Sequence, residues 1–562
     1  MTRFYEELVP VVADRTQWTL PAILRLRAAT HGDRVYLDAP AAGVRLTFAE
    51  TLAVAERVAS GLLERGHARG DRLVVMLPNV PDYLIAWFGS GLAGMAEVPI
   101  NTAYRGSFLE HQISTVAPTG VVVAAGLAAR FVESAAACGT VRRFYVVADG
   151  GDGGDGDAAV AGAVESLRSA GFAAEPFAAL SEVAAGPLPP VRPQELASVF
   201  FTSGTTGLSK GVMMSHAHMA FEATECVSLT RLTDQDVYMA TGPLFHGNAQ
   251  FLAAYPALLA GARFVLRERF SASNWITWAR ESGATVTNFV GVMMDFVHKQ
   301  PPSPADRDNA LRCIFAAPTP ASIAEDFKAR FGVEAFVEVF GLTETAMPIM
   351  TPYGVPRPPG AAGLLVRDWF DVRLVDPDTD DEVPIGQVGE LVVRPLVPFT
   401  MCSGYFGMPD RTVEAMRNCW FHTGDGLRRD EDGWYYFVDR LKDAIRRRGE
   451  NISSYEVEQA ILQHEAVAEC AAIAVPADQE GGEDEVMVFV VLAPGAAVGA
   501  EDLWAFSERR LPYFAVPRYL RFVESLPRTP SEKIQKRELR TIGVDAETVD
   551  RVAVLGGMPA RT

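Results

Sequence analysis

Apolar and polar residues follow two alternating patterns along most of the chain. Short apolar runs, rich in β-branched or aromatic residues, are typical of buried strands. Such runs occupy residues 72–77, 120–125, 143–148 and 198–202. Amphipathic stretches with helical periodicity lie between them. The pattern over residues 45–440 therefore predicts α/β units built on largely parallel sheets.

Residues 47–65 form the clearest predicted helix. Thr47 and Glu50 have the spacing of a capping box, and Gly66 follows the end of the periodic stretch. One face of this helix is expected to be buried and carries Leu52, Ala55, Val58, Ala59, Leu62 and Leu63.

The pattern changes toward the C-terminus. Short alternating strands and turns over residues 389–439 predict a β-rich subdomain that closes a large N-terminal domain. Beyond it we expect a small α+β domain that ends in an exposed basic tail. Its predicted helix, two strands and second helix span residues 455–463, 470–475, 486–492 and 501–510. We place the large domain at residues 1–441 and the small, mobile domain at residues 442–562.

Length and composition fit this division. A chain of 562 residues exceeds one hydrophobic core. The net charge of −19 argues against nucleic acid or an anionic membrane as a partner. The six cysteines include no Cys-x-x-Cys pair, so neither a zinc site nor a disulfide framework is expected. No signal peptide is recognisable and no apolar run reaches the ~18 residues that cross a bilayer. We expect a cytoplasmic monomer or homodimer.

One loop carries the strongest chemical signal. Residues 202–211 follow a predicted strand and read Thr-Ser-Gly-Thr-Thr-Gly-Leu-Ser-Lys-Gly. Glycines let backbone N–H groups surround an anion, hydroxyls add donors, and the lysine adds a mobile positive charge. The loop is therefore expected to bind a polyphosphate, although Ser209 stands where the common nucleotide-binding loop has its second glycine. The predicted phosphate-binding residues are Thr202, Ser203, Gly204, Thr205, Thr206, Gly207 and Lys210.

This order of residues resembles the signature of the adenylate-forming enzymes, which include acyl- and aryl-CoA ligases, luciferases and peptide-synthetase adenylation domains. Five further segments resemble the family in the same order and span nearly the whole chain. Residues 264–287, 300–303, 425–439 and 446–453 look similar to crotonobetaine/carnitine–CoA ligases. The resemblance implies ATP and CoA as co-substrates, Mg²⁺ as cofactor, and a small or medium carboxylic acid as substrate.

Residues 243–248, Pro-Leu-Phe-His-Gly-Asn, resemble the motif that lines the acyl pocket. The resemblance gives His246 a role in orienting the substrate carboxylate and gating the pocket. Peptide-synthetase domains usually have an aspartate at this position to bind an ammonium group, so an α-amino acid is not the expected substrate. The predicted pocket residues are Phe245, Asn248, Gln250 and Asn288.

Two other segments resemble the family's nucleotide site. Residues 315–318 are expected to pack on adenine through Ala317 and Pro318. In residues 340–344, the resemblance assigns adenine stacking to Phe340, phosphate binding to Thr343 and Mg²⁺ to Glu344, with Gly341 between them. One carboxylate together with substrate phosphates is a usual ligand set for Mg²⁺.

The remaining segments resemble ribose, hinge and catalytic motifs. Asp425 is expected to bind the ribose hydroxyls, Arg440 the ribose or a phosphate, and Lys442 to mark the hinge. Residues 528–536 resemble the loop that delivers the catalytic lysine, Lys533. This cation would neutralise charge that develops between the carboxylate and the α-phosphate.

The resemblance implies a carboxylic acid–CoA ligase that forms an acyl-adenylate and pyrophosphate, and then an acyl-CoA. Several positions depart from the family pattern, among them Ser209, Arg448 and Glu532, which replaces the glycine before the catalytic lysine. Ser209 replaces a proline, which is expected to alter only the stiffness of the loop. Arg448 replaces the first glycine of a Gly-Gly pair that lines the tunnel for the acceptor thiol, before Gly449.

Three interpretations of Arg448 remain open. It blocks the tunnel, turns outward to meet CoA phosphates, or belongs to a solvated basic patch over residues 446–448. The first keeps open an adenylating enzyme with another acceptor: a carrier protein, an amine, or nitrite activated for diazotisation. A degenerate, non-catalytic nucleotide-binding protein is disfavoured, because Lys210, Glu344, Asp425, Arg440 and Lys533 are all present.

Overall fold

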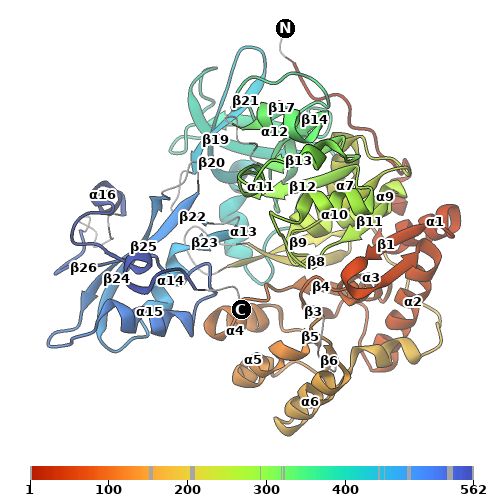
Figure 1. Cartoon of the computed structure of the whole chain (residues 1–562), viewed down its shortest axis with the longest axis horizontal. Coiled ribbons are helices and arrows are strands. Elements are labelled where there is room, and N and C mark those ends of the chain that lie inside the picture. The colour runs from red at the N-terminus through yellow and green to blue at the C-terminus, as the bar shows by residue number, and fades with distance from the viewer. Residues whose placement is uncertain are drawn as a thin grey trace.

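The computed structural model describes residues 3–150, 156–202, 209–290, 293–317, 319, 323–440, 444–447, 450–477, 483–527, 534 and 536–559. Within these residues the chain forms three seven-stranded sheets, one four-stranded sheet and a separate hairpin (Figure 1). A single apolar core cluster joins all three large sheets, since it contains Leu37, Val75 and Leu364.

The first large sheet is parallel except at one edge, where its last two strands are antiparallel. Its strands, in spatial order, are β7 (Ala174–Pro176), β6 (Arg143–Val147), β5 (Gly120–Ala124), β3 (Arg72–Met76), β4 (Ala96–Pro99), β8 (Leu196–Thr202) and β9 (Lys210–Ser215). Strands buried on both faces carry continuous apolar runs, which is why these segments are recognisable in the sequence.

The second large sheet is also parallel apart from one edge pair, β1 with β2. Its strands, in spatial order, are β14 (Ala335–Val337), β13 (Cys313–Ala317), β12 (Val286–Val290), β10 (Val237–Ala240), β11 (Arg263–Leu266), β1 (Val35–Ala39) and β2 (Val44–Thr47).

The third large sheet is antiparallel throughout. Its strands, in spatial order, are β15 (Val339–Leu342), β16 (Ala346–Met350), β17 (Gly363–Leu365), β21 (Trp434–Arg440), β20 (Phe421–Arg429), β19 (Val388–Pro395) and β18 (Phe370–Val375). The predicted β-rich subdomain therefore exists, but it begins near residue 339 rather than 389. Its first strands are short and irregularly spaced, so the change of pattern is invisible there.

Helices connect and cover the two parallel sheets. The longer ones are α1 (Leu20–His31), α2 (Phe48–Glu64), α3 (Pro81–Leu92), α4 (Gly106–Val116), α6 (Gly156–Ser169) and α7 (His216–Thr230). The shorter ones are α5 (Ala128–Glu133), α8 (Gly247–Ala249), α9 (Tyr255–Ala260), α10 (Trp275–Ser282), α11 (Met293–His298), α12 (Ala324–Phe331) and α13 (Pro409–Ala415). The capping box predicted for α2 is confirmed, because Thr47 and Glu50 exchange both hydrogen bonds.

The C-terminal part of the chain has its own sheet and core, and it lies to one side of the larger part (blue in Figure 1). Its strands are β22 (Ala444–Arg447), β23 (Glu450–Ser453), β24 (Val467–Pro476), β25 (Asp484–Leu492), β26 (Tyr519–Phe522) and β27 (Val549–Asp550). Its helices are α14 (Ser454–Ile461), α15 (Ala500–Glu508), α16 (Lys536–Ile542) and α17 (Arg551–Leu555). The four elements predicted for this part are present within a few residues of their expected ends.

Most described residues after 535 are exposed, as predicted for the tail, but the segment is also folded onto the small sheet. Leu539 of α16 is buried against Ile473 and Phe489. β27 extends the small sheet by pairing with β26, and Arg551 is also buried. One buried apolar side chain and the strand pairing therefore attach this segment to the small domain.

No helix among the described residues is long and apolar enough to cross a membrane. The predicted division between residues 441 and 442 lies outside the described part of the chain, and so does the predicted hinge residue Lys442.

Candidate active site

The predicted phosphate and adenine residues lie where parallel strands end. Thr202 is the last residue of β8, and Ala317 is the last of β13. In α/β sheets, ligands bind beyond the carboxyl ends of the strands. Both residues are partly exposed, although the strands behind them are buried.

A carboxylate with two hydroxyl donors forms the centre of the site. The Thr202 hydroxyl donates to Glu344 Oε1 at 3.4 Å, and the Tyr405 hydroxyl donates to the same oxygen at 2.9 Å. Lys210 Nζ lies 4.2 Å from the centroid of the Tyr405 ring. Burial raises the pKa of Tyr405 and the Glu344 carboxylate raises it further, so the hydroxyl stays protonated as a donor. Thr202, Lys210 and Glu344, far apart in the sequence, are thus brought together as predicted.

A tight hairpin between β15 and β16 presents Thr343 and Glu344. A Cβ at Gly341 would lie 2.2 Å from the Ala346 carbonyl oxygen, so only glycine fits. The Met347 N–H donates to Glu225 Oε2 at 3.1 Å, which anchors the far side of the hairpin to α7. Close packing inside the hairpin and the hydrogen bond to α7 therefore hold it in place.

The predicted ribose residues meet on the antiparallel sheet. Asp425 on β20 is buried and is the Cα partner of Arg440 on β21. The Asp425 N–H donates to Thr423 Oγ1 at 3.1 Å, and that hydroxyl donates to the Leu391 carbonyl at 2.7 Å. The Phe340 ring stacks on Phe437, with centroids 6.1 Å apart.

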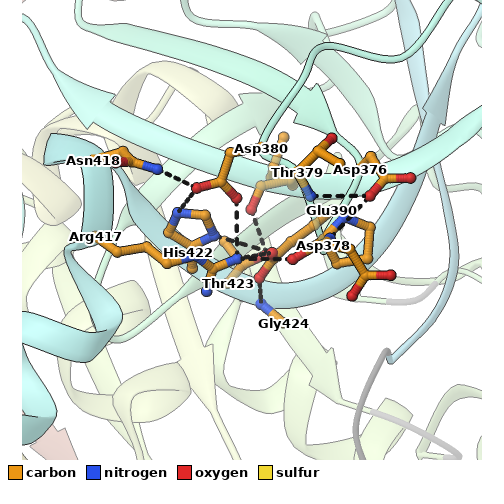
Figure 2. Close-up of polar contacts among 12 residues, drawn as sticks. Asp376, Asp378, Thr379, Asp380, Glu390, Arg417, Asn418, His422, Thr423 and Gly424 are labelled. Carbon is orange, nitrogen blue, oxygen red and sulfur yellow. Dashed lines mark hydrogen bonds and ion pairs between the residues drawn. The ribbon is translucent and has the colours of Figure 1, made fainter.

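The residues that precede Asp425 in the chain belong to a network centred on Glu390 of β19 (Figure 2). Glu390 Oε1 accepts the Gly424 N–H at 2.9 Å, and Oε2 lies 3.0 Å from His422 Nδ1 and 3.2 Å from Arg417 Nη2. Arg417 also donates to Asp380 Oδ1 at 3.1 Å. Burial raises the pKa of Glu390, but the bonds from His422 and Gly424 and the Arg417 charge outweigh it and leave the pKa lowered. The network fixes the turn before Asp425.

The predicted acyl pocket is assembled around α8. Asn288 Nδ2 on β12 donates to both the carbonyl and Oδ1 of Asn248, at 2.8 and 2.7 Å. Phe245 is buried, with its ring centroid 5.0 Å from that of His246. Gln250 opens the π-helical turn η6 (Gln250–Ala254), a rare conformation found frequently at functional sites.

Two glutamates of the small domain reach this site. His246 Nε2 lies 2.9 Å from Glu450 Oε1. The Ser209 N–H donates to Glu456 Oε1 at 2.6 Å, and the Ser209 carbonyl lies 2.8 Å from His111 Nε2. Burial raises the pKa of Glu456 to about 7, against the lowering effect of the Ser209 bonds.

The expectation that Ser209 alters only loop stiffness is therefore wrong. A proline has no N–H, so the hydrogen bond to Glu456 exists only because residue 209 is not proline. The substitution adds a contact between the phosphate-binding loop and the small domain.

The interpretation of residues 446–448 as a solvated basic patch is wrong for Arg447. Its side chain is 1% exposed, and Nη1 donates to the carbonyls of Phe514 and Val516, both at 2.9 Å. Arg447 Nη2 also forms an ion pair with Glu485 at 2.6 Å. Arg447 is thus a core residue of the small domain.

Ten predicted site residues lie outside the described part of the chain: Ser203, Gly204, Thr205, Thr206, Gly207, Pro318, Lys442, Arg448, Gly449 and Lys533. For Arg440, only the backbone is described. Sequence reasoning missed Tyr405, Glu390, Glu450 and Glu456. The last two stand inside or beside segments already matched to the family, whereas Tyr405 follows no periodic pattern.

The described residues contain no group of three His, Cys, Asp or Glu side chains able to hold a metal ion alone. Glu344 nevertheless suits Mg²⁺, which binds one or two carboxylates and completes its shell with phosphates and water.

The sequence matches the AMP-binding enzyme family over residues 24–406 and the AMP-binding enzyme C-terminal domain over residues 456–533. A crotonobetaine/carnitine–CoA ligase of Salmonella paratyphi A is 30% identical over 480 residues, which are 84% of this chain and 89% of that protein. One of Shigella flexneri is 30% identical over 503 residues, 88% of this chain and 93% of that protein.

Solved structures agree with this assignment. o-Succinylbenzoate CoA synthetase of Bacillus subtilis, bound to a product analogue, has a TM-score of 0.76 at 22% identity, covering 94% of this chain and 98% of that one. ATP-bound MatB of Rhodopseudomonas palustris has a TM-score of 0.65 at 28% identity, covering 94% and 99%. The predicted α/β fold and the predicted family resemblance are confirmed. The chain belongs to the AMP-binding enzyme family.

Proposed function

We propose that the protein is an AMP-forming ligase that joins a small or medium carboxylic acid to CoA, with ATP and Mg²⁺. The observation that carries the proposal is the convergence of Thr202, Lys210, Glu344 and Tyr405 where β8 ends. Relatives about 30% identical to this chain are named CoA ligases. The proposal includes domains at residues 1–441 and 442–562, with the hinge at Lys442.

In the first half-reaction, a carboxylate oxygen of the acid attacks the α-phosphorus of ATP, and the bond to the β-phosphate oxygen breaks. Pyrophosphate leaves and an acyl-adenylate remains. Lys210 and Thr343 bind phosphate oxygens, and Asp425 accepts hydrogen bonds from the ribose hydroxyls. Lys533 neutralises charge at the reacting centre. When bound at Glu344, Mg²⁺ neutralises further phosphate charge. Positioning and charge stabilisation account for the rate without a protein nucleophile.

In the second half-reaction, the thiol of CoA attacks the acyl carbon, its proton passes to solvent, and AMP leaves with the oxygen that joined it to the acyl group. The contact of His246 with Glu450 brings the small domain to the acyl side. We propose that this docked arrangement serves the thiol step, with Arg448 and Gly449 near the tunnel. Mobile domains commonly divide successive steps in this way.

His246 stands at the position of the peptide-synthetase aspartate, so residue 246 itself offers no carboxylate to an ammonium group, and an α-amino acid is not the proposed substrate. Acceptors other than CoA form a second candidate only if Arg448 closes the tunnel. We also propose that the protein acts as a monomer or homodimer in the cytoplasm.

Mass spectrometry of products from the enzyme, MgATP, CoA and a pool of aliphatic, betaine-like and aryl acids tests this function. A new acyl-CoA together with AMP supports it. Acyl-adenylate and pyrophosphate without thioester would move the acceptor away from CoA, and no product with any acid would contradict the proposal.

Replacement of Lys533 with alanine should nearly abolish pyrophosphate release, because no other group is assigned to its charge. Lys536→Ala is the matched control, since Lys536 pairs with Glu458 within the small domain. Unchanged release by Lys533→Ala would contradict the assigned role of Lys533.

A further inference from the structure

An open cavity of about 660 Å³ lies between the large and the small domain. The large domain contributes Arg105, the N-cap residue of α4, and this helix lies beside the small domain in Figure 1. The small domain contributes Arg509 at the end of α15, and Arg551 with residues 555–559 from the C-terminal segment. The reaction described above uses none of these residues. The C-terminal group also lies beyond residue 533, where the match to the family's C-terminal domain ends.

The arginines of this cavity have hydrogen-bond donors that the protein does not use. Arg105 Nε is buried without a partner among the described residues, and Arg105 Nη2 donates to the Leu511 carbonyl at 3.4 Å, a long distance for such a bond. Arg551 Nε is also buried without a described partner, although its other two nitrogens contact the Gly557 carbonyl and the Glu508 carboxylate. Since most buried polar atoms in proteins are paired, these donors indicate a missing acceptor.

The charge around the cavity is positive. Burial lowers the pKa of Arg105, and the carboxylates of Glu508 and Glu133 offset this only in part. Burial and the Arg105 charge also lower the pKa of Arg130. Arg509 is exposed at the rim, and its side chain has no hydrogen bond or ion pair with any described residue. Guanidinium groups therefore outnumber carboxylates here, which favours an anionic ligand.

Docking of the small domain brings these like charges together. Arg105 comes from the large domain, whereas Arg509 and Arg551 come from the small domain. Their repulsion costs free energy unless an anion lies between them. A phosphate group suits this position, because its oxygens accept several hydrogen bonds and guanidinium groups bind it through paired N–H donors. One such anion can thus bind both domains at once.

We propose that this cavity binds a phosphate group and that the bound phosphate holds the small domain in its docked position. The phosphate comes from one of two sources, a phosphate ester on CoA or free phosphate in solution. The first source rests on the proposed function, whereas the site itself does not.

Calorimetry with inorganic phosphate and the full-length protein measures binding in the absence of acid and nucleotide. Fluorescence energy transfer between labels on the two domains measures docking over the same titration. Because a ligand held by both domains binds only the docked state, phosphate at about ten times its Kd should raise the docking constant about tenfold. Potassium chloride at equal ionic strength is the salt control and should have no comparable effect.

Two variants test the assigned residues. Arg105→Gln and Arg509→Gln should each weaken phosphate binding about tenfold, the loss expected for one hydrogen bond to a charged group. Arg509 is exposed, so its replacement tests the site without disturbing a buried contact. Arg510→Gln is the matched control, because Arg510 is the next residue but stacks on Phe506 and donates to Gln463 at 3.1 Å. This control should leave phosphate binding and docking unchanged.

Thioester formation with CoA and with 3′-dephospho-CoA identifies the source of the phosphate. The two acceptors differ only in one phosphate ester. If that ester occupies the cavity, KM should be about tenfold lower for CoA, and Arg105→Gln or Arg509→Gln should remove the difference. Equal KM values, together with phosphate binding that both variants weaken, would assign the site to free phosphate.

The readouts keep this proposal and the proposed function distinguishable. The phosphate site would be overturned if neither free phosphate nor the CoA ester binds, if binding survives both variants, or if bound phosphate leaves docking unchanged. Phosphate binding that strengthens docking, without a thioester from any acid, would support the site and contradict the proposed function alone. Thioester formation without any effect of phosphate would do the reverse.

Discussion

Two buried glutamates of the site, Glu390 and Glu97, differ in how the protein compensates for burying a carboxyl group. On the ribose side, Glu390 receives hydrogen bonds from Gly424, His422 and Arg417, and its pKa is lowered (Figure 2). On the acyl side, Glu97 accepts a hydrogen bond from Gln250 at 2.6 Å and lies beside the Tyr83 hydroxyl, and burial raises its pKa to about 8 because both partners are neutral.

The difference between the two pKa values follows from the partners of each carboxyl group. Both oxygens of the Glu390 carboxylate are hydrogen-bonded within the protein, and Glu390 holds the backbone turn that precedes Asp425. Glu97 has only neutral partners, so burial keeps its carboxyl group mostly protonated at neutral pH. Burial alone therefore does not decide whether a glutamate is charged; the charge of its hydrogen-bonding partners does.

The same substitution at the two sites should have very different effects. Glu390→Gln removes a charge that the pKa shift shows to be stabilised, and it leaves Arg417 and His422 facing a neutral amide. We expect it to lower the free energy of unfolding by about 2–4 kcal/mol. Glu97→Gln replaces a mostly protonated group with one of the same shape and should cost less than about 1 kcal/mol at pH 7. Urea denaturation of both variants measures the difference.

The pH dependence sharpens this comparison. The folded-state pKa of Glu97 is raised, so its contribution to stability is present at low pH and is lost as pH rises through about 8. The unmodified protein should therefore lose stability relative to Glu97→Gln between pH 7 and pH 9. Equal slopes for the two proteins over this range would show that Glu97 is already ionised at pH 7.

The next largest effect concerns the hydrogen bond between Ser209 and Glu456 of the small domain. Ser209→Pro removes the N–H that bonds Glu456, whereas Ser209→Ala keeps it. We expect Ser209→Pro to slow thioester formation by about tenfold, the cost of leaving a buried acceptor unpaired. Pyrophosphate release and acyl-CoA formation, measured separately, locate the affected step. If Ser209→Ala shows the same loss, the side chain rather than the N–H carries the contact.

Glu456 should make docking of the small domain weakly pH-dependent. Its pKa is about 7 when docked and ordinary when exposed, so the docked state binds the proton more tightly. Docking should strengthen roughly tenfold from pH 8 to pH 6 and stay constant above pH 8. Fluorescence energy transfer between labels on the two domains measures this, and Glu456→Gln should abolish the dependence. A dependence that persists in this variant would contradict the role of Glu456.

The smallest expected effect concerns Tyr405. Tyr405→Phe removes one of two donors to Glu344 Oε1 and should raise KM for MgATP by roughly fivefold, with little change in kcat. Steady-state kinetics with ATP varied would show this, and Thr202→Val is the companion variant for the second donor.

The sequence predicts much of this molecule because both parallel sheets are buried on both faces and their strands carry continuous apolar runs. Family-like motifs also select Thr202, Lys210 and Glu344, which the fold brings together. The early start of the antiparallel sheet could not be predicted, since strands as short as β17 carry little periodicity. The partners of Ser209 and Glu97 depend on segments far apart in the chain, so no local pattern reveals them.

Transfer of an isotopic label tests the central claim most directly. The acid is supplied with both carboxylate oxygens as ¹⁸O, together with MgATP and CoA, and the nucleotide product is analysed by mass spectrometry. A route through an acyl-adenylate predicts AMP that carries one ¹⁸O and a thioester that carries the other. ADP as the nucleotide product, with the label in inorganic phosphate, or AMP without label would contradict it.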